Sequence, residues 1–522
     1  MGNMASIMKG SLYIFSFEKV LFSEREKDML FNSYIFVLLF LPSALLVYFA
    51  FNNYGWHKAA LWSLTIMSFI FYAYNNVKYV CVLGISIVIN WIIANLLLQT
   101  SETELPKTKK RYNRKWILQI GILINVGSIF YYKYLNFFME NINRLCAADF
   151  RLQNIILPLG ISFFTFQQIS YLVDSYRGET RGYTFTEYAA FVSFFPQLVA
   201  GPIVLHSEII PQLRDKNRKR FKQENFAHGI YIFATGLFKK VLIADTFGKA
   251  VSWGWSNIET MTSLEILIVM LSYTFQIYFD FSGYCDMAVG IGRMFNMEFP
   301  INFNSPYKSY SVLEFWKKWH ITLTRFLRNY IYYPLGGSKK GKLHTYVNIL
   351  VVFLISGIWH GANWTFILWG GAHGFAQILN RIFKNIWDRC NPVFQWICTF
   401  GFINIMWLFF RADNIKQAVI LIKRMAAMDT LTINNKLYDT FMLEEIKALE
   451  EYVRPLSYLR EHIPGLYMWI ALAGALFICL NMENLHVKKF KQTFFTAFQT
   501  VIMLVWSIIS FAGVSIFLYF NF

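Results

Sequence analysis

Residues 346–379 read YVNILVVFLISGIWHGANWTFILWGGAHGFAQIL, and histidine is the only residue type among them that titrates near neutral pH. A helix that crosses a bilayer needs roughly 20 predominantly apolar residues. The stretch and its neighbours are long enough for two short spanning helices of about 17 residues each. We expect them at about 344–359 and 364–380, with His360 in the middle of the apolar run.

The whole chain shares this character. Of its 522 residues, 56% are hydrophobic and 19% aromatic, and only 15% are charged. Soluble globular proteins carry about 25% charged residues. This composition argues against a disordered chain, a coiled coil and an ordinary soluble enzyme. The net charge of +18 does not favour nucleic-acid binding, because the cations lie between long apolar runs rather than on one solvated face.

Local signals exclude several other classes of protein. The six cysteines form no CxxC pair, which favours small packed residues over a disulfide framework or a metal site. The first twenty residues contain no sustained apolar region before Glu18 and Lys19, so we expect no cleavable signal peptide.

We predict an all-α polytopic membrane protein with about 10–12 spanning helices. The candidate spans, each with approximate ends, are 33–51, 59–75, 78–99, 116–138, 155–176, 227–246, 263–281, 344–359, 364–380, 393–410, 466–482 and 493–520. The segment before the first span mixes apolar and charged residues, and we expect it to lie along the membrane interface as an amphipathic helix.

Clustered cations predict the orientation of these spans. Cytoplasmic loops carry an excess of Lys and Arg. The clusters are Lys107, Lys109, Lys110, Arg111, Arg114 and Lys115; Arg214, Lys216, Arg218, Lys219, Arg220 and Lys222; Lys317, Lys318, Arg325, Arg328, Lys339, Lys340 and Lys342; Arg381, Lys384 and Arg389; and Lys488, Lys489 and Lys491. Twelve spans with both termini outside place all five clusters in the cytoplasm. The acidic loop at about 429–464 then lies outside.

Two segments fit this pattern of spans badly. Residues 185–213 contain a short apolar run broken by Pro196, Gly201 and Pro202, and residues 299–343 mix aromatic residues with Lys and Arg. Broken backbone at membrane depth is tolerated only inside protein or beside a water-filled cavity. We expect both segments to be re-entrant or interfacial walls of a functional cavity.

Two histidines are candidates for chemistry, because ionisable residues at membrane depth are functional by default. Gly357 and Gly361 flank His360, and we expect them to leave space beside its ring. If FWKKWHITLTRF is helical, Trp316, His320 and Thr324 share one face. The alternative is a neutral histidine bonded to a backbone carbonyl. His373 follows His360, but no nearby Cys, Asp or Glu completes a ligand set, so we expect no metal.

A second candidate is QIYFDFSGYCDMAVGIGRMF at residues 276–295. Asp280 and Asp286 either shape a cavity floor or bind a polar substrate group, or one of them pairs with Arg293 in a helix–helix contact. PLGGSKKGK, with Lys339, Lys340 and Lys342, suits an anionic phosphate or is a positive-inside loop. A histidine in a membrane cavity, with cations on the cytoplasmic side, fits acyl transfer from an anionic carrier such as acyl-coenzyme A. The histidine then acts as general base.

The residues also resemble a known family. The run DFSGYCDMAVGIGRMFNMEFPINFNSPYKSYSVLEFWKKWHITLTRFLRNYIYYPLGG at 280–337, followed by GIWHGANWTFILWGGAHG at 357–374, is similar to the membrane-bound O-acyltransferase family. It looks most like the bacterial branch with the alginate O-acetyltransferase and peptidoglycan O-acetyltransferase membrane subunits. SFFPQLVAGPI at 193–203 and MLFNSYIFVLLFLP at 29–42 also look like that branch.

The resemblance implies a fold of tilted helices in a ring around a central tunnel. It assigns residues 29–411 to the catalytic core, with 1–28 as an N-terminal extension, 412–464 as a horizontal extracytoplasmic segment and 465–522 as C-terminal membrane helices. It implies that His360 is the catalytic histidine and His320 the second histidine of the tunnel. We expect the tunnel lining to include Trp316, Trp319, Trp359, Asn363, Trp364, Asp280, Ser282, Tyr284 and Asp286. Candidate donor-phosphate residues are Lys317, Lys318, Arg325, Arg328, Lys339 and Lys340.

The resemblance further implies an O-acetyltransferase of the bacterial cell membrane. It would take acetyl from cytoplasmic acetyl-CoA, hold no permanent cofactor, and work with an extracytoplasmic SGNH-type partner on a polysaccharide such as alginate or a cell-wall glycan. One alternative is a D-alanyl transferase for teichoic acid. Another is a transporter or flippase without chemistry, which would need paired internal repeats or charges along a path. We see no clear inverted repeat.

Overall fold

The computed structural model describes residues 29–99, 113–450, 452–487, 489–513 and 517–518. Every regular element within these ranges is a helix. The predicted N-terminal extension at 1–28, including most of its interfacial helix, lies outside the described residues, as do four cations of the first cluster and Lys488.

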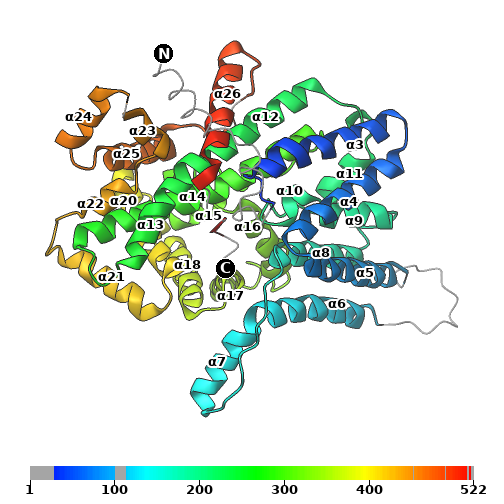
Figure 1. Cartoon of the computed structure of the whole chain (residues 1–522). Coiled ribbons are helices and arrows are strands. Elements are labelled where there is room, and N and C mark those ends of the chain that lie inside the picture. Colours follow the sequence, from blue (N-terminus) through cyan, green and yellow to red (C-terminus); the bar gives the residue numbers. More distant parts are fainter. Residues whose placement is uncertain (1–28, 100–112, 451, 488, 514–516, 519–522) are drawn as a thin grey trace, which may run out of the picture.

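The order of the helices along the chain can be followed in Figure 1. Those of the first half are η1 (Ile35–Phe40), α3 (Leu41–Asn53), α4 (His57–Asn75), α5 (Val77–Gln99), α6 (Arg114–Ile129), η2 (Phe130–Tyr134), α7 (Leu135–Cys146), α8 (Ile161–Arg177), α9 (Phe185–Ser193), α10 (Phe195–Leu198), α11 (His206–Arg214), η3 (Lys216–Arg218), α12 (Gln223–Phe238), η4 (Lys239–Ala244) and α13 (Asp245–Ser256). Those of the second half are α14 (Ser263–Met294), η5 (Pro306–Lys308), α15 (Val312–Lys318), α16 (Ile321–Leu327), η6 (Arg328–Tyr332), α17 (Lys342–His360), α18 (Trp364–Ile382), α19 (Lys384–Trp387), α20 (Pro392–Arg411), α21 (Ile415–Ala427), α22 (Asn435–Asp439), α23 (Glu444–Glu450), α24 (Arg454–His462), α25 (Leu466–Asn481), α26 (Phe494–Ile509) and η7 (Ser510–Gly513).

Six helical stretches are long and apolar enough to cross a membrane, which confirms the all-α polytopic prediction. They are Ile35–Asn53, Val77–Gln99, Gln223–Ser256, Ser263–Met294, Lys342–His360 and Pro392–Arg411. Leu466–Asn481 and Phe494–Ile509 are shorter apolar helices. All twelve predicted spans contain a helix, but some ends differ from the prediction.

The largest difference at a span start is in the predicted span 155–176, whose helix begins only at Ile161. Pro158 has no backbone N–H to continue a helix. Gly160 has a left-handed backbone with φ of +69°, and a Cβ there would lie 2.5 Å from the carbonyl oxygen of Leu198. The extended residues before α8 are therefore dictated by a proline and by a glycine that the neighbouring α10 segment approaches closely.

Helix α14 is the central element, and almost every residue along it is buried. It packs against α12 and α13 (Figure 1). Glycines allow a close backbone approach, because a Cβ on Gly236 would lie 2.5 Å from the carbonyl oxygen of Gly283. A helix that is apolar all round must be enclosed by others. The rest of the protein therefore surrounds α14.

The first broken segment and residues 299–327 of the second are largely buried, whereas residues 333–343 of the second are mostly exposed. In the first, α9 and α10 are joined at Phe194, and Phe191 and Phe195 are fully buried. In the second, the short helices α15 and α16 carry Trp316 and Leu323 into the core. Both segments therefore supply irregular backbone at depth, where protein groups can satisfy it.

Candidate active site

His360 is the last residue of α17, at the tip of the α17–α18 hairpin. Gly361 is extended, and the side chain of Asn363 then caps α18 by accepting a hydrogen bond from the backbone N–H of Thr365 at 3.0 Å. The Asn363 amide also donates to the carbonyl of Asp413 at 2.8 Å. A short, doubly held turn thus fixes the end of the helix that carries His360.

Glycines bring the two helices of the hairpin into backbone contact. A Cβ on Gly357 would collide with the carbonyl oxygen of Phe366, and one on Gly370 would collide with that of Phe353. A Cβ on Gly361 would strike the Phe366 ring. The prediction that Gly357 and Gly361 leave open space beside the imidazole is therefore wrong, because α18 fills that space.

The imidazole of His360 is enclosed by aromatic rings. Its centroid lies 4.9 Å from Trp359, 5.2 Å from Trp369 and 5.2 Å from Phe410, and the residue is buried. Such a site excludes bulk water from the ring. Exclusion of water strengthens any electrostatic interaction made with a reacting group.

His320 lies at a break in the chain rather than on a continuous helix. Helix α15 ends at Lys318, Trp319 is extended, and His320 has a left-handed backbone with φ of +44° before α16 begins at Ile321. The predicted common face of Trp316, His320 and Thr324 is therefore wrong. A non-glycine residue in this region costs roughly 1–2 kcal/mol, and such strain often occurs at functional sites.

Asn302 holds this break. Its carbonyl accepts from the Ile321 N–H at 3.0 Å. Its side-chain oxygen accepts from the backbone N–H and the hydroxyl of Thr322 at 3.2 and 2.6 Å. The first turn of α16 has N–H groups without helical acceptors. Asn302 supplies acceptors there and so fixes the position of His320.

The break and the hairpin bring the two histidines together from segments far apart in sequence. Their ring centroids are 6.5 Å apart. The Trp359 ring lies 5.9 Å from His320, and Phe281 of α14 lies 4.8 Å from it. The two predicted catalytic residues therefore share one buried, aromatic-walled centre.

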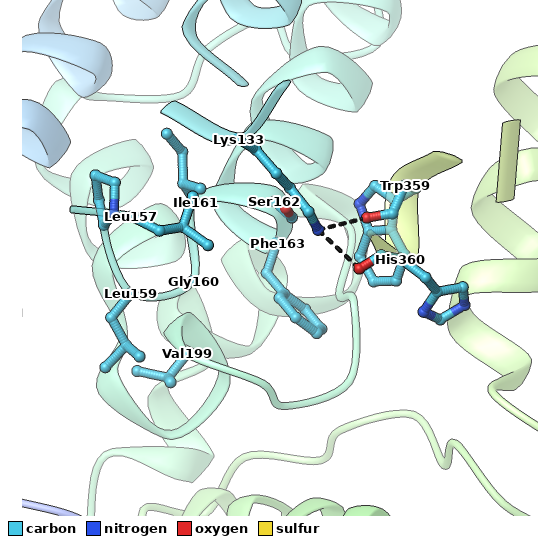
Figure 2. Close-up of a pocket in the computed structure, with 11 residues that line it drawn as sticks. Lys133, Leu157, Leu159, Gly160, Ile161, Ser162, Phe163, Val199, Trp359 and His360 are labelled. Carbon is cyan, nitrogen blue, oxygen red and sulfur yellow. Dashed lines mark hydrogen bonds between the residues drawn. The ribbon is translucent and has the colours of Figure 1, made fainter. Parts of the chain in front are cut away.

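A cavity of about 50 Å³ lies at the end of α17, which we call the Lys133 cavity (Figure 2). Lys133 crosses to α17, and its ammonium donates to the carbonyls of Trp359 at 2.7 Å and His360 at 3.0 Å. In Figure 2 the His360 imidazole points away from the ammonium. The sequence reasoning missed Lys133, although a lone lysine in the predicted span 116–138 was the signal for it.

A second opening adjoins Trp316 and is lined by several cations. Two neighbouring cavities of about 460 and 170 Å³ share Trp316, Thr324, Gln377 and Arg381 in their walls. We call them together the cationic cavity. Lys317, Arg328 and Lys384 also line it. Trp316 separates it from the interior, where its indole N–H donates to His373 at 3.1 Å.

The four tryptophans predicted to line the tunnel lie in different surroundings. Trp316, Trp319 and Trp359 are buried, and the Trp359 ring contacts both His320 and His360. Trp364 is 52% exposed and donates to the Asn141 side chain at 2.9 Å, on the outer side of the hairpin.

The predicted donor-phosphate cations fall into three groups. Lys317 and Arg328 line the cationic cavity. Lys318 and Arg325 pair with Glu314 and Glu208. Lys339 and Lys340 are exposed on the turn before α17. Arg381 and Lys384 line the cavity as well, and the sequence reasoning had used them only as signals of orientation.

The α14 carboxylates pair with lysines of η4, so the expected pairing with Arg293 is wrong. Asp280 binds Lys240 at 2.7 Å, and Asp286 binds Lys239 at 2.7 Å. Lys240 also binds Asp245 at 2.8 Å, and Asp286 contacts His486 at 2.8 Å. Arg293 pairs with Glu298 instead.

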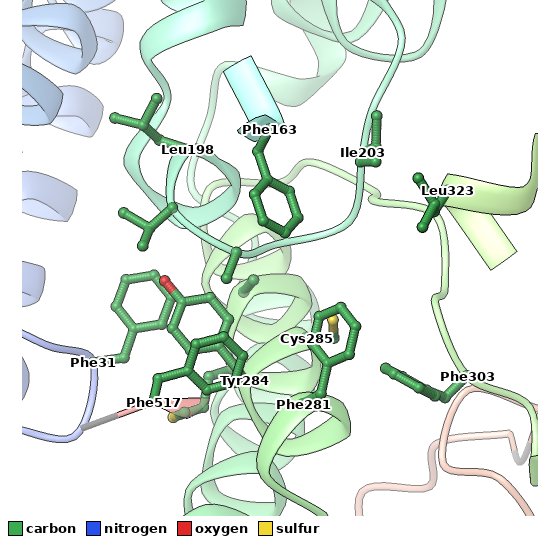
Figure 3. Packing of buried hydrophobic residues seen from close by; sticks show 14 of the residues in the cluster. Phe31, Phe163, Leu198, Ile203, Phe281, Tyr284, Cys285, Phe303, Leu323 and Phe517 are labelled. Atoms are coloured by element: carbon green, nitrogen blue, oxygen red, sulfur yellow. The ribbon is translucent and has the colours of Figure 1, made fainter. Parts of the chain in front are cut away.

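Ser282 and Tyr284, on the same stretch of α14, are buried. The Tyr284 ring stacks on Phe31 and on Phe517, with centroids 4.8 and 4.6 Å apart (Figure 3). The backbone N–H of Leu518 donates to Asp280 at 3.0 Å. The predicted lining residues of α14 thus meet segments from both ends of the chain.

A separate polar cluster surrounds Asp174 at the end of α8. Its carboxylate accepts from Tyr330 at 2.7 Å, contacts His206 at 3.1 Å and pairs with Arg177. Burial, together with the bond to Asp174, raises the pKa of the Tyr330 phenol, which stays a donor. Asp174 and His206, with Glu179, could also hold a metal ion by geometry. The expectation of no metal stays a prediction.

Comparisons with known proteins agree with this arrangement. Residues 55–415 match the model of MBOAT, the membrane-bound O-acyltransferase family. The chain is 42% identical over 436 residues to the peptidoglycan O-acetyltransferase of Helicobacter pylori, covering 78% of this chain and 81% of that protein. It is 36% identical over 397 residues to the probable alginate O-acetylase AlgI of Pseudomonas aeruginosa, covering 75% and 73%.

A more distant relative is the teichoic acid D-alanyltransferase of Bacillus subtilis, 25% identical over 256 residues, or 47% of this chain and 63% of that protein. The family match spans both histidines and the helices that position them. The resemblance predicted from the sequence is thereby confirmed. This chain belongs to the membrane-bound O-acyltransferase family, and it is a multi-pass membrane acyltransferase.

Proposed function

We propose that this acyltransferase takes acetyl from cytoplasmic acetyl-CoA and passes it across the membrane to a cell-envelope polysaccharide, through an extracytoplasmic SGNH-type partner. The observation that supports this most is the position of the histidine pair. The ring centroids of His320 and His360 lie 6.5 Å apart, His360 lines the Lys133 cavity, and the cationic cavity is lined by Ser356, one turn before His360 on α17.

The cationic cavity is the proposed entrance for the donor. Lys317 and Arg381 suit the phosphates of coenzyme A, because clustered cations attract an anionic ligand, and Lys384, which pairs with Asp388 at 2.7 Å, lies beside them. Apolar residues such as Ile349 and Val352 line the smaller of its two cavities. Charge patterning predicts that this side faces the cytoplasm, with both termini outside.

The proposed reaction is an acyl transfer assisted by His360. The imidazole accepts the proton of the acceptor hydroxyl while the hydroxyl oxygen attacks the thioester carbonyl carbon. The carbon–sulfur bond then breaks, and the coenzyme A sulfur leaves with the proton from His360. A positioned general base contributes typically 10²–10⁴-fold in rate, as an order of magnitude. His320 orients the His360 imidazole or shares the transferred proton with it.

The proposed final acceptor is a cell-wall glycan ahead of an alginate-like exopolysaccharide. The Helicobacter pylori peptidoglycan O-acetyltransferase is 42% identical to this chain, and the Pseudomonas aeruginosa alginate protein is 36% identical. Teichoic acid D-alanylation is the weaker alternative, because that relative aligns with only 47% of the chain. The proposed location is the bacterial cytoplasmic membrane.

The test is transfer of labelled acetyl from acetyl-CoA by membranes that contain the full chain and its partner. We expect label in the polysaccharide with wild type and a loss of about 10²–10⁴-fold for His360→Gln. His57→Gln is the matched control, since His57 lies at the start of α4 and contacts Asn52. No transfer by the wild type, or full transfer by His360→Gln, would contradict the proposal.

A second experiment tests the donor entrance. Arg381→Gln with Lys384→Gln should raise the KM for acetyl-CoA about tenfold if lost phosphate contacts total about 1.4 kcal/mol, with kcat little changed. Lys339→Gln with Lys340→Gln removes two exposed cations outside the cavity and should change KM less. A larger rise in KM for the Lys339 and Lys340 variant than for the Arg381 and Lys384 variant would place the donor at the turn before α17.

A further inference from the structure

The end of α17 is held by another helix through its last three carbonyls. The hydroxyl of Tyr134 donates to the carbonyl of Ile358 at 2.6 Å. The ammonium of Lys133 donates to the next two, those of Trp359 and His360. The last four carbonyls of any helix lack helical partners. Here two consecutive side chains satisfy three of these carbonyls, including that of the candidate base itself.

The donors come from a local irregularity in their own helix. Lys133 and Tyr134 end the π-helical turn η2, which interrupts the run of α6 into α7. Residues one apart on a regular helix point about 100° away from each other, because the helix has 3.6 residues per turn. In η2, both side chains reach the same end of α17. π-Helical turns are frequent at functional sites.

Lys133 is an unusual choice for this position. Its ammonium is partly buried beside a membrane helix, and the structure shows no ion pair for it among the described residues. A charged side chain in the bilayer core is expensive and marks a functional site by default. The negative end of the α17 dipole offsets part of this cost, since a cation is stabilised at a helix C-terminus.

We propose that Lys133 is a positioning residue for acyl transfer, which fixes the peptide units on both sides of His360 and so sets the direction of the imidazole. The inference rests on the proposed role of His360 as base. Lys133 acts through the backbone, because the imidazole points away from its ammonium (Figure 2). The ammonium has three donors, of which the two carbonyls use two.

The position of the imidazole matters because proton transfer needs close alignment. A displacement of about 1 Å, even from a change remote from the chemistry, can cost about 10²-fold in rate. Without the ammonium, the carbonyls of Trp359 and His360 lose these donors, and the bond from Tyr134, the Asn363 turn and the contact with α18 remain to hold the final turn of α17. Its end then frays, and His360 samples orientations that do not face the acceptor.

The experiment compares Lys133→Met, Lys133→Arg and Tyr134→Phe with wild type in the acetyl-transfer assay. Methionine keeps the length without the donors, so kcat should fall about 10²-fold while the KM for acetyl-CoA stays unchanged. Arginine keeps donors and charge and should recover at least part of kcat. Tyr134→Phe removes one neutral hydrogen bond farther from His360 and should lower kcat about three- to tenfold.

Hydrogen exchange gives a readout that does not depend on activity. Peptides covering 355–363 should exchange faster in Lys133→Met, whereas peptides from α14 should keep the wild-type rate. Lys249→Met, which removes an exposed lysine of α13, is the control and should leave kcat and exchange unchanged.

The outcomes separate this inference from the proposed function. Inactive wild-type membranes contradict the function itself. An active wild type with Lys133→Met at full kcat overturns the positioning role, as does a loss in Lys133→Arg as large as in Lys133→Met with both proteins folded. If Lys133→Met does not fold, Tyr134→Phe decides, and unchanged kcat and exchange in that variant overturn the inference.

Discussion

The two histidines of the centre sit at helix ends of opposite polarity. His360 is the last residue of α17, where carbonyls are left over, and Lys133 and Tyr134 supply donors. His320 precedes α16, where N–H groups are left over, and Asn302 supplies acceptors. The same need, to hold an imidazole at membrane depth, is met by opposite chemistry.

This difference explains why a cation stands beside one histidine and a neutral amide beside the other. A helix C-terminus carries a partial negative charge, which favours a lysine. A helix N-terminus needs acceptors, and an amide oxygen provides them without an added charge. Side-chain chemistry around each histidine therefore follows from the backbone, and substitutions should affect the two sites in different ways.

The largest effect should come from removing the imidazoles themselves. His360→Gln should lower kcat about 10²–10⁴-fold, and His320→Gln should lower it less. If the rings act as one unit, the double variant should be little worse than His360→Gln alone, because effects of coupled residues are not additive. The measurement is kcat for acetyl transfer by all three variants. Fully multiplicative losses would mean that the two sites work independently.

The next effect concerns the hairpin that presents His360. Gly370→Ala places a methyl group against the carbonyl oxygen of Phe353. Overpacking typically costs about 1–3 kcal/mol, and occasionally more where the backbone cannot shift. We expect the Gly370→Ala protein to have a lower melting temperature than wild type. The melting temperature is measured by tryptophan fluorescence in detergent. Gly401→Ala in α20 is the control, since no atom lies within 4 Å of a Cβ there. Equal melting temperatures would contradict the close hairpin contact.

A smaller effect should come from the support of His320. Asn302→Ala leaves the N–H and hydroxyl of Thr322 without their shared side-chain acceptor. A buried donor left unsatisfied costs about 1–3 kcal/mol. We expect reduced thermal stability and reduced kcat, with Asn435→Ala, an exposed position in α22, near wild type in both. An Asn302→Ala protein as stable and active as wild type would show that the chain break at His320 does not need the Asn302 side chain.

The smallest effect isolates the backbone of His320. His320→Gly and His320→Ala both remove the imidazole, but glycine adopts the left-handed conformation without strain. The glycine variant should be about 1 kcal/mol more stable than the alanine variant, while both lose activity. Comparison of their melting temperatures checks this. An alanine variant of equal or greater stability would show that the strained backbone relaxes when the ring is removed.

The sequence was informative where local patterns decide structure. Apolar runs located the helices, and the rule that ionisable residues at membrane depth are functional singled out His360 and His320. The same rule applied to Lys133, Lys239 and Lys240, which also lie within predicted spans, yet they were not singled out. The same rule, applied to every lysine within a predicted span, would have identified all three.

Other features depend on contacts between distant segments. Asp286 has Arg293 nearby in sequence, but the structure pairs it with Lys239 from another helix. Gly357 suggested open space, but its small size serves the approach of α18. The left-handed residue at His320 is supported by Asn302, before α15, and no local periodicity marks such a break.

The ion pairs between η4 and α14 have a consequence for how the protein enters the membrane. Lys239 and Lys240 belong to one spanning stretch, and Asp280 and Asp286 belong to the next. A charged residue at the centre of a lone helix costs about 2.5–3.5 kcal/mol during insertion. Insertion of the two stretches together, with their charges already paired, avoids most of this cost. The translocation machinery should therefore release residues 223–294 into lipid as one unit during synthesis.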